Sequence, residues 1–307
     1  MEGEIFASPI EPLFNHEHAL ETHILQDWLI NLAKKNFRHI NQAHSKQGLF
    51  KQVNAVETIM YAAEKLKIAQ EAKYLAIELF DRFLYNHLQD LRDHVLKLPK
   101  KRQMKEWSSL QEGVSNQVLL RIVSCCQIAS KLTSHYKAFL FQVVSVNRAK
   151  RFLCTCGYRY ASESLLQSEL RVLKTLKFQV TEPTPIVFIE TLLEILGCNN
   201  TKAEVKTFYY VALKLLDLLY LKYHTFYKIL FEVISSSKIH SKEQKREFSK
   251  VKADQLLLAT AVISCSVYMV QEDKADEMIK ELNRITRISK NDIEDFASVL
   301  IQLVEEE

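Results

Sequence analysis

The sequence predicts an all-helical protein built from two tandem five-helix bundles, each around a buried third helix. Its 307 residues include only five glycines and five prolines, so the turn chemistry of β-hairpins is largely missing. Apolar residues recur at helical spacing, and the β-branched residues do not alternate as they do in strands. A hydrophobic fraction of 48% is enough to bury the core of one large domain or two ordinary ones.

Residues 1–45 are polar and histidine-rich, and we interpret them as an N-terminal extension with one short amphipathic helix over Ile24–Leu32. The first bundle spans 46–180 and opens with two amphipathic helices. The apolar stripe of each helix follows helical spacing: Val53, Val56, Met60 and Ala63 in the first, and Ala72, Ala76, Leu79 and Phe83 in the second.

The charged segment 86–115 lacks a long apolar stripe and is interpreted as an insertion. Gln117–Leu132 is apolar nearly all round, so this helix must be covered on most sides inside the bundle. A fourth helix is predicted over Phe139–Leu153, and Ser162 is the expected N-cap of a fifth.

Two prolines in Thr181–Pro185 disfavour helix and predict the boundary between the bundles. The second bundle, 184–305, is predicted to contain five helices, the third again apolar almost all round and the last capped by Ser289. These helices are expected over Pro185–Leu196, Ala203–Tyr220, Ala253–Val270, Asp273–Ile285 and Ser289–Val304.

Composition restricts the classes of function. The six cysteines lie mostly in apolar runs without disulfide-like spacing, which is typical of core residues in a reducing compartment. The apolar run Leu256–Val270 is interrupted by polar residues and is shorter than the ~18 apolar residues of a membrane span, so no membrane association is expected. A net charge of +4 does not by itself indicate nucleic-acid binding.

The motifs of common enzyme classes are missing. The sequence contains no GxSxG elbow, phosphate-binding glycine loop, HExxH pair or paired CxxC motifs, and Cys154 and Cys156 are separated by only one residue. We therefore expect no catalytic activity, no metal site and no cofactor.

Two charged features remain as candidate sites. A basic cluster, formed by Lys97, Lys100, Lys101, Arg102 and Lys105, has the composition of a nuclear-import signal or a phosphate-contacting patch, but also of a solvated loop. Glu169 has apolar neighbours at i−4, i−3, i+3 and i+4, so its carboxylate needs an internal partner, solvent or another protein. Lys131 ends the polar line of the buried helix.

These residues together resemble the cyclin family, from about Phe50 to the C-terminus. Asp81–Leu84 is similar to the DRFL motif that ends the second helix of a cyclin box, and Ile128–Leu132 is similar to the ASK signature of the third. Ser168–Phe178 resembles the cyclin stretch in which a glutamate precedes a leucine-rich turn and a phenylalanine.

The resemblance implies a function. In cyclins, the lysine and glutamate at the positions of Lys131 and Glu169 bind main-chain groups around the αC helix of a cyclin-dependent kinase. Positioning αC seats the kinase's own Lys–Glu ion pair, so a rigid helical surface activates catalysis without contributing chemistry.

A closer resemblance, to a cyclin-family branch that acts in meiosis, runs through Arg121–Leu132 and Pro183–Gly197. It implies a role on meiotic chromosomes in the nucleus, with some cytoplasmic protein. The implied activity is to promote crossover maturation with a cyclin-dependent kinase and other meiotic recombination factors.

Three departures from the cyclin pattern are apparent. Spacing from Asp81 places Gln52 where cyclins have a buried arginine, so that ion pair is expected to be absent or replaced by a neutral hydrogen bond. Lys51, Asn54 and Thr58 stand where the cyclin substrate-docking patch is apolar, which argues against docking of RxL-type substrates. The insertion 86–115 is longer than the corresponding cyclin connection and either adds a binding surface or obstructs one.

Two alternatives to a kinase regulator stay open. The first is a cyclin-fold scaffold that binds recombination proteins without a kinase, which Gln52 and the long insertion favour. The second is a nucleic-acid-binding protein of the same fold, whose only support is the basic cluster; direct DNA binding is therefore not our expectation.

Overall fold

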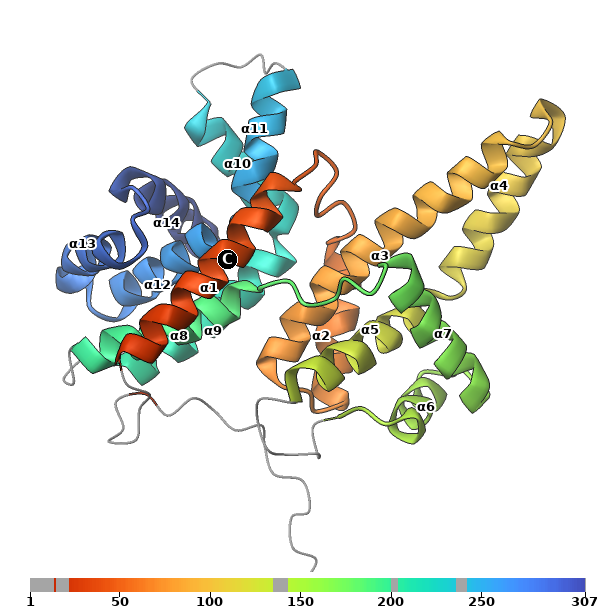
Figure 1. Ribbon diagram of the computed structural model, residues 1–307, viewed down its shortest axis with the longest axis horizontal. Coiled ribbons are helices and arrows are strands. Elements are labelled where there is room, and N and C mark those ends of the chain that lie inside the picture. Colours follow the sequence, from red (N-terminus) through yellow and green to blue (C-terminus); the bar gives the residue numbers. More distant parts are fainter. Residues whose placement is uncertain (1–13, 15–21, 135–142, 200–203, 236–241, 307) are drawn as a thin grey trace, which may run out of the picture. The chain divides into compact units, whose positions relative to one another are not determined.

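The computed structural model describes Phe14 and residues 22–134, 143–199, 204–235 and 242–306. Every regular element among these residues is a helix, which confirms the predicted all-helical fold (Figure 1). The chain forms two compact units, the first including Gly48–Thr181 and the second Glu11–Gln47 with Glu182–Glu307. The division falls after Thr181, in the segment where the prolines predict it.

The first unit is organised around one enclosed helix, α5. Its helices are α2 (Val53–Lys65), α3 (Gln70–Leu96), α4 (Lys100–Ser115), α5 (Val118–Thr133), α6 (Val146–Thr155) and α7 (Ser162–Thr175). Helix α5 packs against α2, α3, α6 and α7, and its residues from Ile122 to Ser130 are all buried. The buried third helix of the first bundle is therefore confirmed.

The predicted insertion 86–115 is helical. Helix α3 continues to Leu96, and α4 follows after Pro99, so the two helices form a long hairpin (Figure 1). No residue of α4 is buried. A helix that buries no face needs no long apolar stripe, which agrees with the charged sequence of this segment.

Two helix starts in the first unit differ from the sequence interpretation. Helix α6 begins at Val146 after the N-cap Ser145, and the predicted start at 139–142 lies outside the described residues. The N-cap of α7 is Ala161, and Ser162 is the first helical residue, without a side-chain capping bond. The prediction that Ser162 caps this helix is therefore wrong.

The second unit surrounds α12, whose residues from Gln255 to Val267 are all buried. Its helices are α1 (Thr22–Asn41), α8 (Pro185–Asn199), α9 (Val205–Leu221), α10 (Tyr223–Ile234), α11 (Lys242–Ala253), α12 (Gln255–Val270), α13 (Ala275–Thr286) and α14 (Lys290–Glu305). Helix α12 packs against α8, α9, α13 and α14, so its predicted central position is confirmed. The capping prediction for α14 is also confirmed, because the Ser289 side chain accepts a hydrogen bond from the Asp292 N–H at 3.1 Å.

Helices α10 and α11 were not predicted, so the second unit has more than five helices. Only one residue, Lys222, separates α9 from α10, and neither Gly nor Pro marks the break. Helix α11 is strongly charged, and few of its side chains, among them Phe248 and Ser249, are buried.

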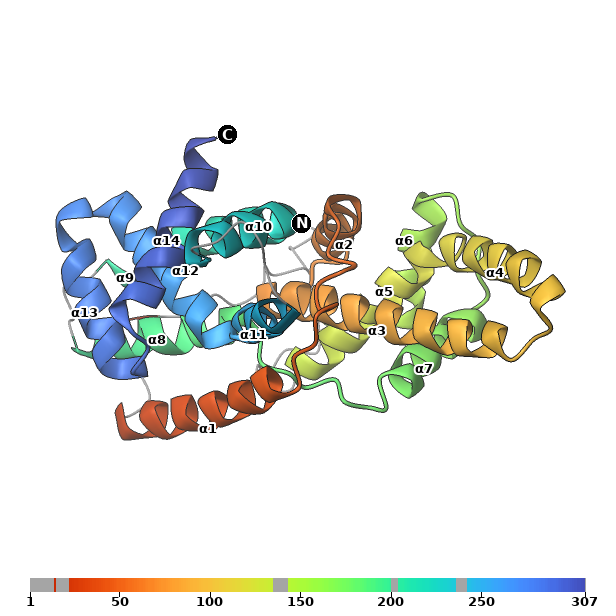
Figure 2. The same cartoon turned by 90° about the horizontal axis from the view of Figure 1, so that it is seen from above.

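The N-terminal helix is longer than the predicted Ile24–Leu32, and it packs on the second unit, along α8 and beside α11 (Figure 2). Its buried stripe consists of Leu25, Leu29 and Leu32. Near its C-terminal end, the buried Asn36 donates to Asp254 at 2.8 Å and accepts from the Gln255 N–H at 3.0 Å. These bonds join α1 to the N-terminus of the central helix α12.

Within the described ranges, no single helix is long and apolar enough to cross a membrane. One bent pair of helices, Glu243–Ala253 with Gln255–Val270, satisfies that criterion by length and composition together.

Candidate functional site

Lys131 and Glu169, the two candidate partner-binding residues, lie together in the structure. Lys131 is in the last turn of α5, and Glu169 is near the middle of α7, which packs against α5. The Lys131 ammonium donates to Oε1 of Glu169 at 2.5 Å. The carboxylate therefore has the internal donor that its apolar surroundings require.

Burial differs between the two partners. The Glu169 side chain is 11% exposed, whereas that of Lys131 is 43% exposed. On α7, Leu165 and Val172 are buried, but Leu166, three residues before Glu169, is 50% exposed. The ion pair thus lies at the edge of the hydrophobic core, beside an exposed apolar side chain.

The pair can form further hydrogen bonds. An ammonium carries three donors and a carboxylate two acceptor oxygens, while the contact between them uses one donor and Oε1. Among the described residues, neither side chain forms another hydrogen bond. The remaining Lys131 donors and the free Glu169 oxygen lie side by side. They can therefore hydrogen-bond to a peptide group of a partner, or to the unpaired main-chain groups at the end of a partner helix.

An exposed aromatic residue, Phe178, follows α7 in the same stretch and was not singled out as a site residue. Its side chain is 62% exposed, and its backbone has a φ of 60°. The Phe178 N–H donates to the Leu173 carbonyl at 2.9 Å, so the turn that ends α7 fixes this left-handed conformation. Its position at the end of the cyclin-like stretch was the available sequence signal, but exposure could not be predicted from it.

Asp81, the candidate structural residue of α3, is buried and accepts two backbone hydrogen bonds. The Gly48 N–H donates to Oδ2 and the Phe50 N–H donates to Oδ1, both at 2.8 Å. Burial raises the pKa of Asp81, and the positive charge of Lys51 opposes that rise. Asp81 thereby anchors the segment that leads into α2.

The assignment of Gln52 as the neutral replacement for a buried arginine is wrong. Gln52 is exposed, and its side-chain amide donates to the Leu49 carbonyl at 3.0 Å. The buried cation is its neighbour Lys51, whose side chain is 2% exposed and lies 2.6 Å from Oε1 of Glu78. The buried position is therefore one residue earlier than the spacing from Asp81 predicts, and a lysine rather than a glutamine occupies it.

Lys51 is also wrongly placed in the predicted polar surface of the first helix, because it is buried. Asn54 is exposed as predicted, and Thr58 is partly buried. The same helix exposes two large side chains, Val53 at 46% and Tyr61 at 51%. The surface of α2 is therefore mixed rather than uniformly polar.

The basic cluster is exposed at the tip of the α3–α4 hairpin. Lys97 is the C-cap of α3, and the other four cations lie in the first two turns of α4: Lys100, Lys101, Arg102 and Lys105. Among the described residues, none of the five cations has an ion-pair partner. Their positive charge is therefore available to solvent or to an anionic partner.

A metal site and a reactive thiol depend on how the His, Cys, Asp and Glu side chains of the described residues are placed. No three His, Cys, Asp or Glu side chains there are grouped to hold a metal ion. Cys125, Cys126 and Cys265 are buried, and burial raises the pKa of Cys126 and of Cys265 to about 12. These thiols stay protonated near neutral pH and serve as core residues.

Comparisons with known proteins agree with the fold. A profile of the family "Cyclin, N-terminal domain" matches residues 31–181, which include the second half of α1 as well as Gly48–Thr181 of the first unit. Cyclin-A2-3 of Arabidopsis thaliana is 25% identical over 185 residues, which is 60% of this chain and 33% of that protein.

Two relatives match nearly the whole chain. The cyclin N-terminal domain-containing protein 1 of Mus musculus is 32% identical over 282 residues, covering 91% of this chain and 83% of the mouse protein. The human protein of the same name is 31% identical over 282 residues, covering 91% and 84%. Both the enclosed central helices and this sequence similarity lead to one conclusion: the chain belongs to the cyclin family.

Proposed function

We propose that the protein is a non-catalytic, cyclin-like regulator that promotes crossover maturation in meiotic recombination on nuclear chromosomes. It acts through protein partners, among them a cyclin-dependent kinase. Membership of the cyclin family supports a regulatory role. The meiotic setting rests on the resemblance of Arg121–Leu132 and Pro183–Gly197 to the meiotic branch of that family.

One observation carries the kinase part of the proposal, namely the ion pair between Lys131 and Glu169 at the edge of the core. Two packed helices hold the pair, so little side-chain entropy is lost when a partner binds it. The exposed Leu166 beside the pair, and Phe178 at the end of α7, supply apolar contact area. A partner helix with free main-chain groups at its end fits such a surface.

Co-elution with purified cyclin-dependent kinases tests the proposal. We expect the wild-type chain to co-elute with at least one kinase, and Lys131→Ala and Glu169→Ala to weaken that association by about tenfold or more, as for buried charged contacts. The matched controls are Lys65→Ala and Glu64→Ala, which remove an exposed ion pair on α2. Equal co-elution of all four variants would refute the assigned face.

Loss of folding must be separated from loss of binding. Because Glu169 is mostly buried, Glu169→Gln is included as a variant that retains the shape of the side chain. Each variant is compared by thermal unfolding before the binding experiment. A binding defect in a variant that melts like the wild type is assigned to the surface itself.

The kinase-independent scaffold is the second candidate, and the α3–α4 hairpin favours it. No residue of α4 is buried, and the basic cluster at the tip has no intramolecular partner among the described residues. Affinity capture from meiotic cells with the wild type and with a chain in which all five cations are replaced by glutamine tests this role. Recombination proteins captured without any kinase, and lost with the glutamine variant, would support the scaffold.

The same glutamine variant tests the nucleic-acid alternative. A phosphate-driven mode requires an affinity for duplex DNA that falls steeply as the salt concentration rises. A wild-type affinity that stays flat across salt concentrations, or that equals the affinity of the glutamine variant, would exclude this mode.

A further inference from the structure

The first unit contains a groove that the proposed kinase-binding face does not use. It has two adjoining lobes, which share Gln117, Arg121 and Arg171. Helices α3, α4, α5 and α7 form the lining. Arg121 is ten residues before Lys131 on α5, or about 15 Å along the helix axis, so on that helix the groove and Lys131 lie at opposite ends. On α7 the groove is lined by residues before and after Glu169, but not by Glu169 itself.

The first lobe is apolar and has a volume of about 180 Å³. Its apolar wall includes Phe80, Phe83, Leu84, Leu91, Leu110 and Val118. An apolar cavity of about 150 Å³ holds a benzene ring, so this lobe has room for one large apolar side chain.

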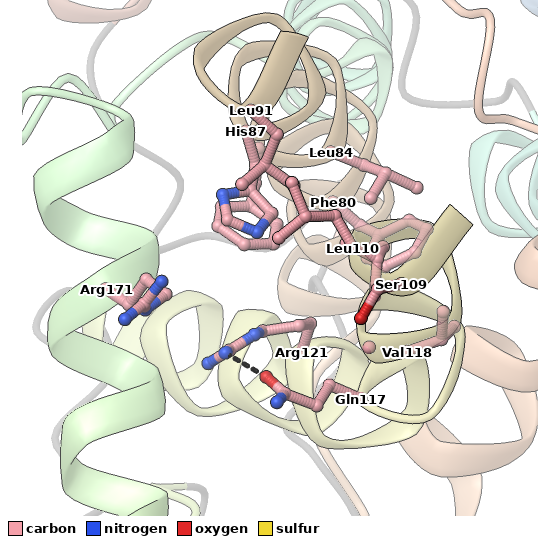
Figure 3. A pocket seen from close by; sticks show the side chains of 13 residues that line it. Phe80, Leu84, His87, Leu91, Ser109, Leu110, Gln117, Val118, Arg121 and Arg171 are labelled. Carbon is pink, nitrogen blue, oxygen red and sulfur yellow. Dashed lines mark hydrogen bonds between the residues drawn. The ribbon is translucent and has the colours of Figure 1, made fainter. Parts of the chain in front are cut away.

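The second lobe is polar, and three cations line it: Arg121, Arg171 and Lys174. No Asp or Glu lines either lobe. Figure 3, which draws the lining of the first lobe, shows the two shared arginines near one another, with His87 across from them. Burial lowers the pKa of His87, and the positive charges of Arg121 and Arg171 lower it further, against the opposing charge of Asp90.

Arg121 is held in place for binding an anion. Its guanidinium donates to the Ser168 hydroxyl at 2.6 Å and to the Gln117 side-chain oxygen at 2.5 Å. A guanidinium has five N–H donors, so three remain. Arg171 is exposed, and its side chain has no hydrogen-bond or ion-pair partner among the described residues.

We propose that this groove binds an extended peptide of a partner protein, with a phosphorylated serine or threonine against the cations and a large apolar side chain in the adjoining lobe. A phosphate group carries a charge of about −1.5 to −2 and three acceptor oxygens, which matches three convergent cations better than one carboxylate does. Arginine clusters are a recurrent means of binding phosphorylated peptides. The adjoining lobe also requires an apolar side chain from the ligand, which neither free phosphate nor a nucleic acid provides.

A positional peptide set tests the proposal on the full-length chain. Each fluorescein-labelled peptide has a central phosphothreonine and one leucine, placed two to five residues before or after it in an alanine and serine background. We expect fluorescence anisotropy to show binding in at least one register. Removal of the phosphate, or of the leucine, should weaken binding by about tenfold or more, corresponding to a single strong contact.

Variants of the chain identify the surface. Arg171→Ala should weaken the same peptide by about tenfold, as removal of a charged hydrogen-bond donor does, and Arg171→Lys should restore part of the affinity. Leu110→Asn changes the apolar lobe at a helix without buried residues, so it should weaken binding without unfolding the unit. Arg151→Ala, which removes an exposed arginine of α6 outside both the groove and the basic cluster, is the matched control.

The outcomes separate this inference from the proposed function. Lack of binding in every register, or binding insensitive to Arg171→Ala, would overturn it. Equal competition by inorganic phosphate or by a single-stranded oligonucleotide, with no effect of Leu110→Asn, would also overturn it by showing an unspecific anion site. Kinase co-elution is expected to be unchanged in Arg171→Ala, so either idea can fail without the other.

Discussion

The ion pair between Lys51 and Glu78 lies buried within the first unit. Both side chains are less than a tenth exposed, and Asp81 adds a second buried carboxyl group beside them. Removing one partner of such a pair takes away the opposite charge that its buried neighbour faces, which costs more than the net contribution of the intact pair.

Lys51→Met is therefore expected to lower the free energy of unfolding by about 3–5 kcal/mol at neutral pH. Replacing Glu78 by leucine in the same chain should recover much of this loss. Urea denaturation followed by circular dichroism measures both effects, and a Lys51→Met chain with the wild-type midpoint would contradict the assignment of the pair.

The loss in Lys51→Met should also depend on pH. Without Lys51, burial raises the pKa of Asp81 further above its ordinary value of 3.8, because the opposing charge is gone. A folded-state pKa above the unfolded value means that stability is lost as the pH rises through the folded pKa. The difference in stability between wild type and variant should hence grow from pH 4 toward neutrality.

Cysteine reactivity gives a second test at this scale. Cys154 is exposed and Cys156 partly exposed, whereas Cys125, Cys126 and Cys265 are buried and have raised pKa values. Because the thiolate is the reactive form, a maleimide should label Cys154 and Cys156 in the native chain and the three buried cysteines only after unfolding. Peptide mass spectrometry reports the labelled positions, and fast labelling of Cys126 in the native state would contradict the core assignment.

Helix ends provide a matched pair of substitutions at the scale of elements. Ser289 caps α14 through the Asp292 N–H, whereas Ser162 begins α7 without capping it. Ser289→Ala should lower the free energy of unfolding by about 1 kcal/mol, as loss of an N-cap does. Ser162→Ala should change it far less. Equal losses in thermal unfolding would contradict the observed caps.

Gly113 is a helical glycine whose backbone does not require glycine. Its φ is not positive, and a Cβ atom added there would meet nothing within 4 Å. Glycine costs a helix interior about 0.8–1.0 kcal/mol relative to alanine. Gly113→Ala should accordingly stabilise the α3–α4 hairpin by up to about 1 kcal/mol, which hydrogen exchange of α4 amides would detect as slower exchange.

At the scale of the whole molecule, the N-terminal helix is an integral part of the second unit. Its leucine stripe is buried, and Asn36 bonds to the N-terminus of α12 across more than 200 residues of sequence. Residues far apart in the chain therefore share one core, and the N-terminal extension contributes to the stability of the C-terminal unit.

Leu29→Ala tests this contribution. The leucine is 8% exposed, so we expect its truncation to cost about 2–5 kcal/mol and to accelerate amide exchange in α8 and α12. Exchange in α5, the central helix of the first unit, should stay unchanged. Ile30→Ala, at a position 51% exposed on the same helix, is the control and should have little effect on either unit.

Sequence reasoning succeeded where a local pattern decides the structure. Helical periodicity located α5 and α12, and the prolines near Thr181 located the division of the chain. It failed at α10, where one residue without a helix-breaking type separates two helices, and at α11, where the buried stripe is small. The sequence left open whether Glu169 meets an internal partner, solvent or another protein. Helical periodicity shows which face of its own helix a residue occupies, but not which residue of another helix packs against it.

By itself, the sequence determined the helical class, the two enclosed central helices, the cyclin resemblance and the two charged candidates at the edge of the core. All of these depend on residue types and spacings within one or two helices. Only the tertiary structure decided that Lys51 rather than Gln52 is the buried cation, that α1 belongs to the second unit, and that three cations converge beside an apolar lobe. These features depend on contacts between helices distant in sequence, which packing of side chains fixes and no local pattern encodes.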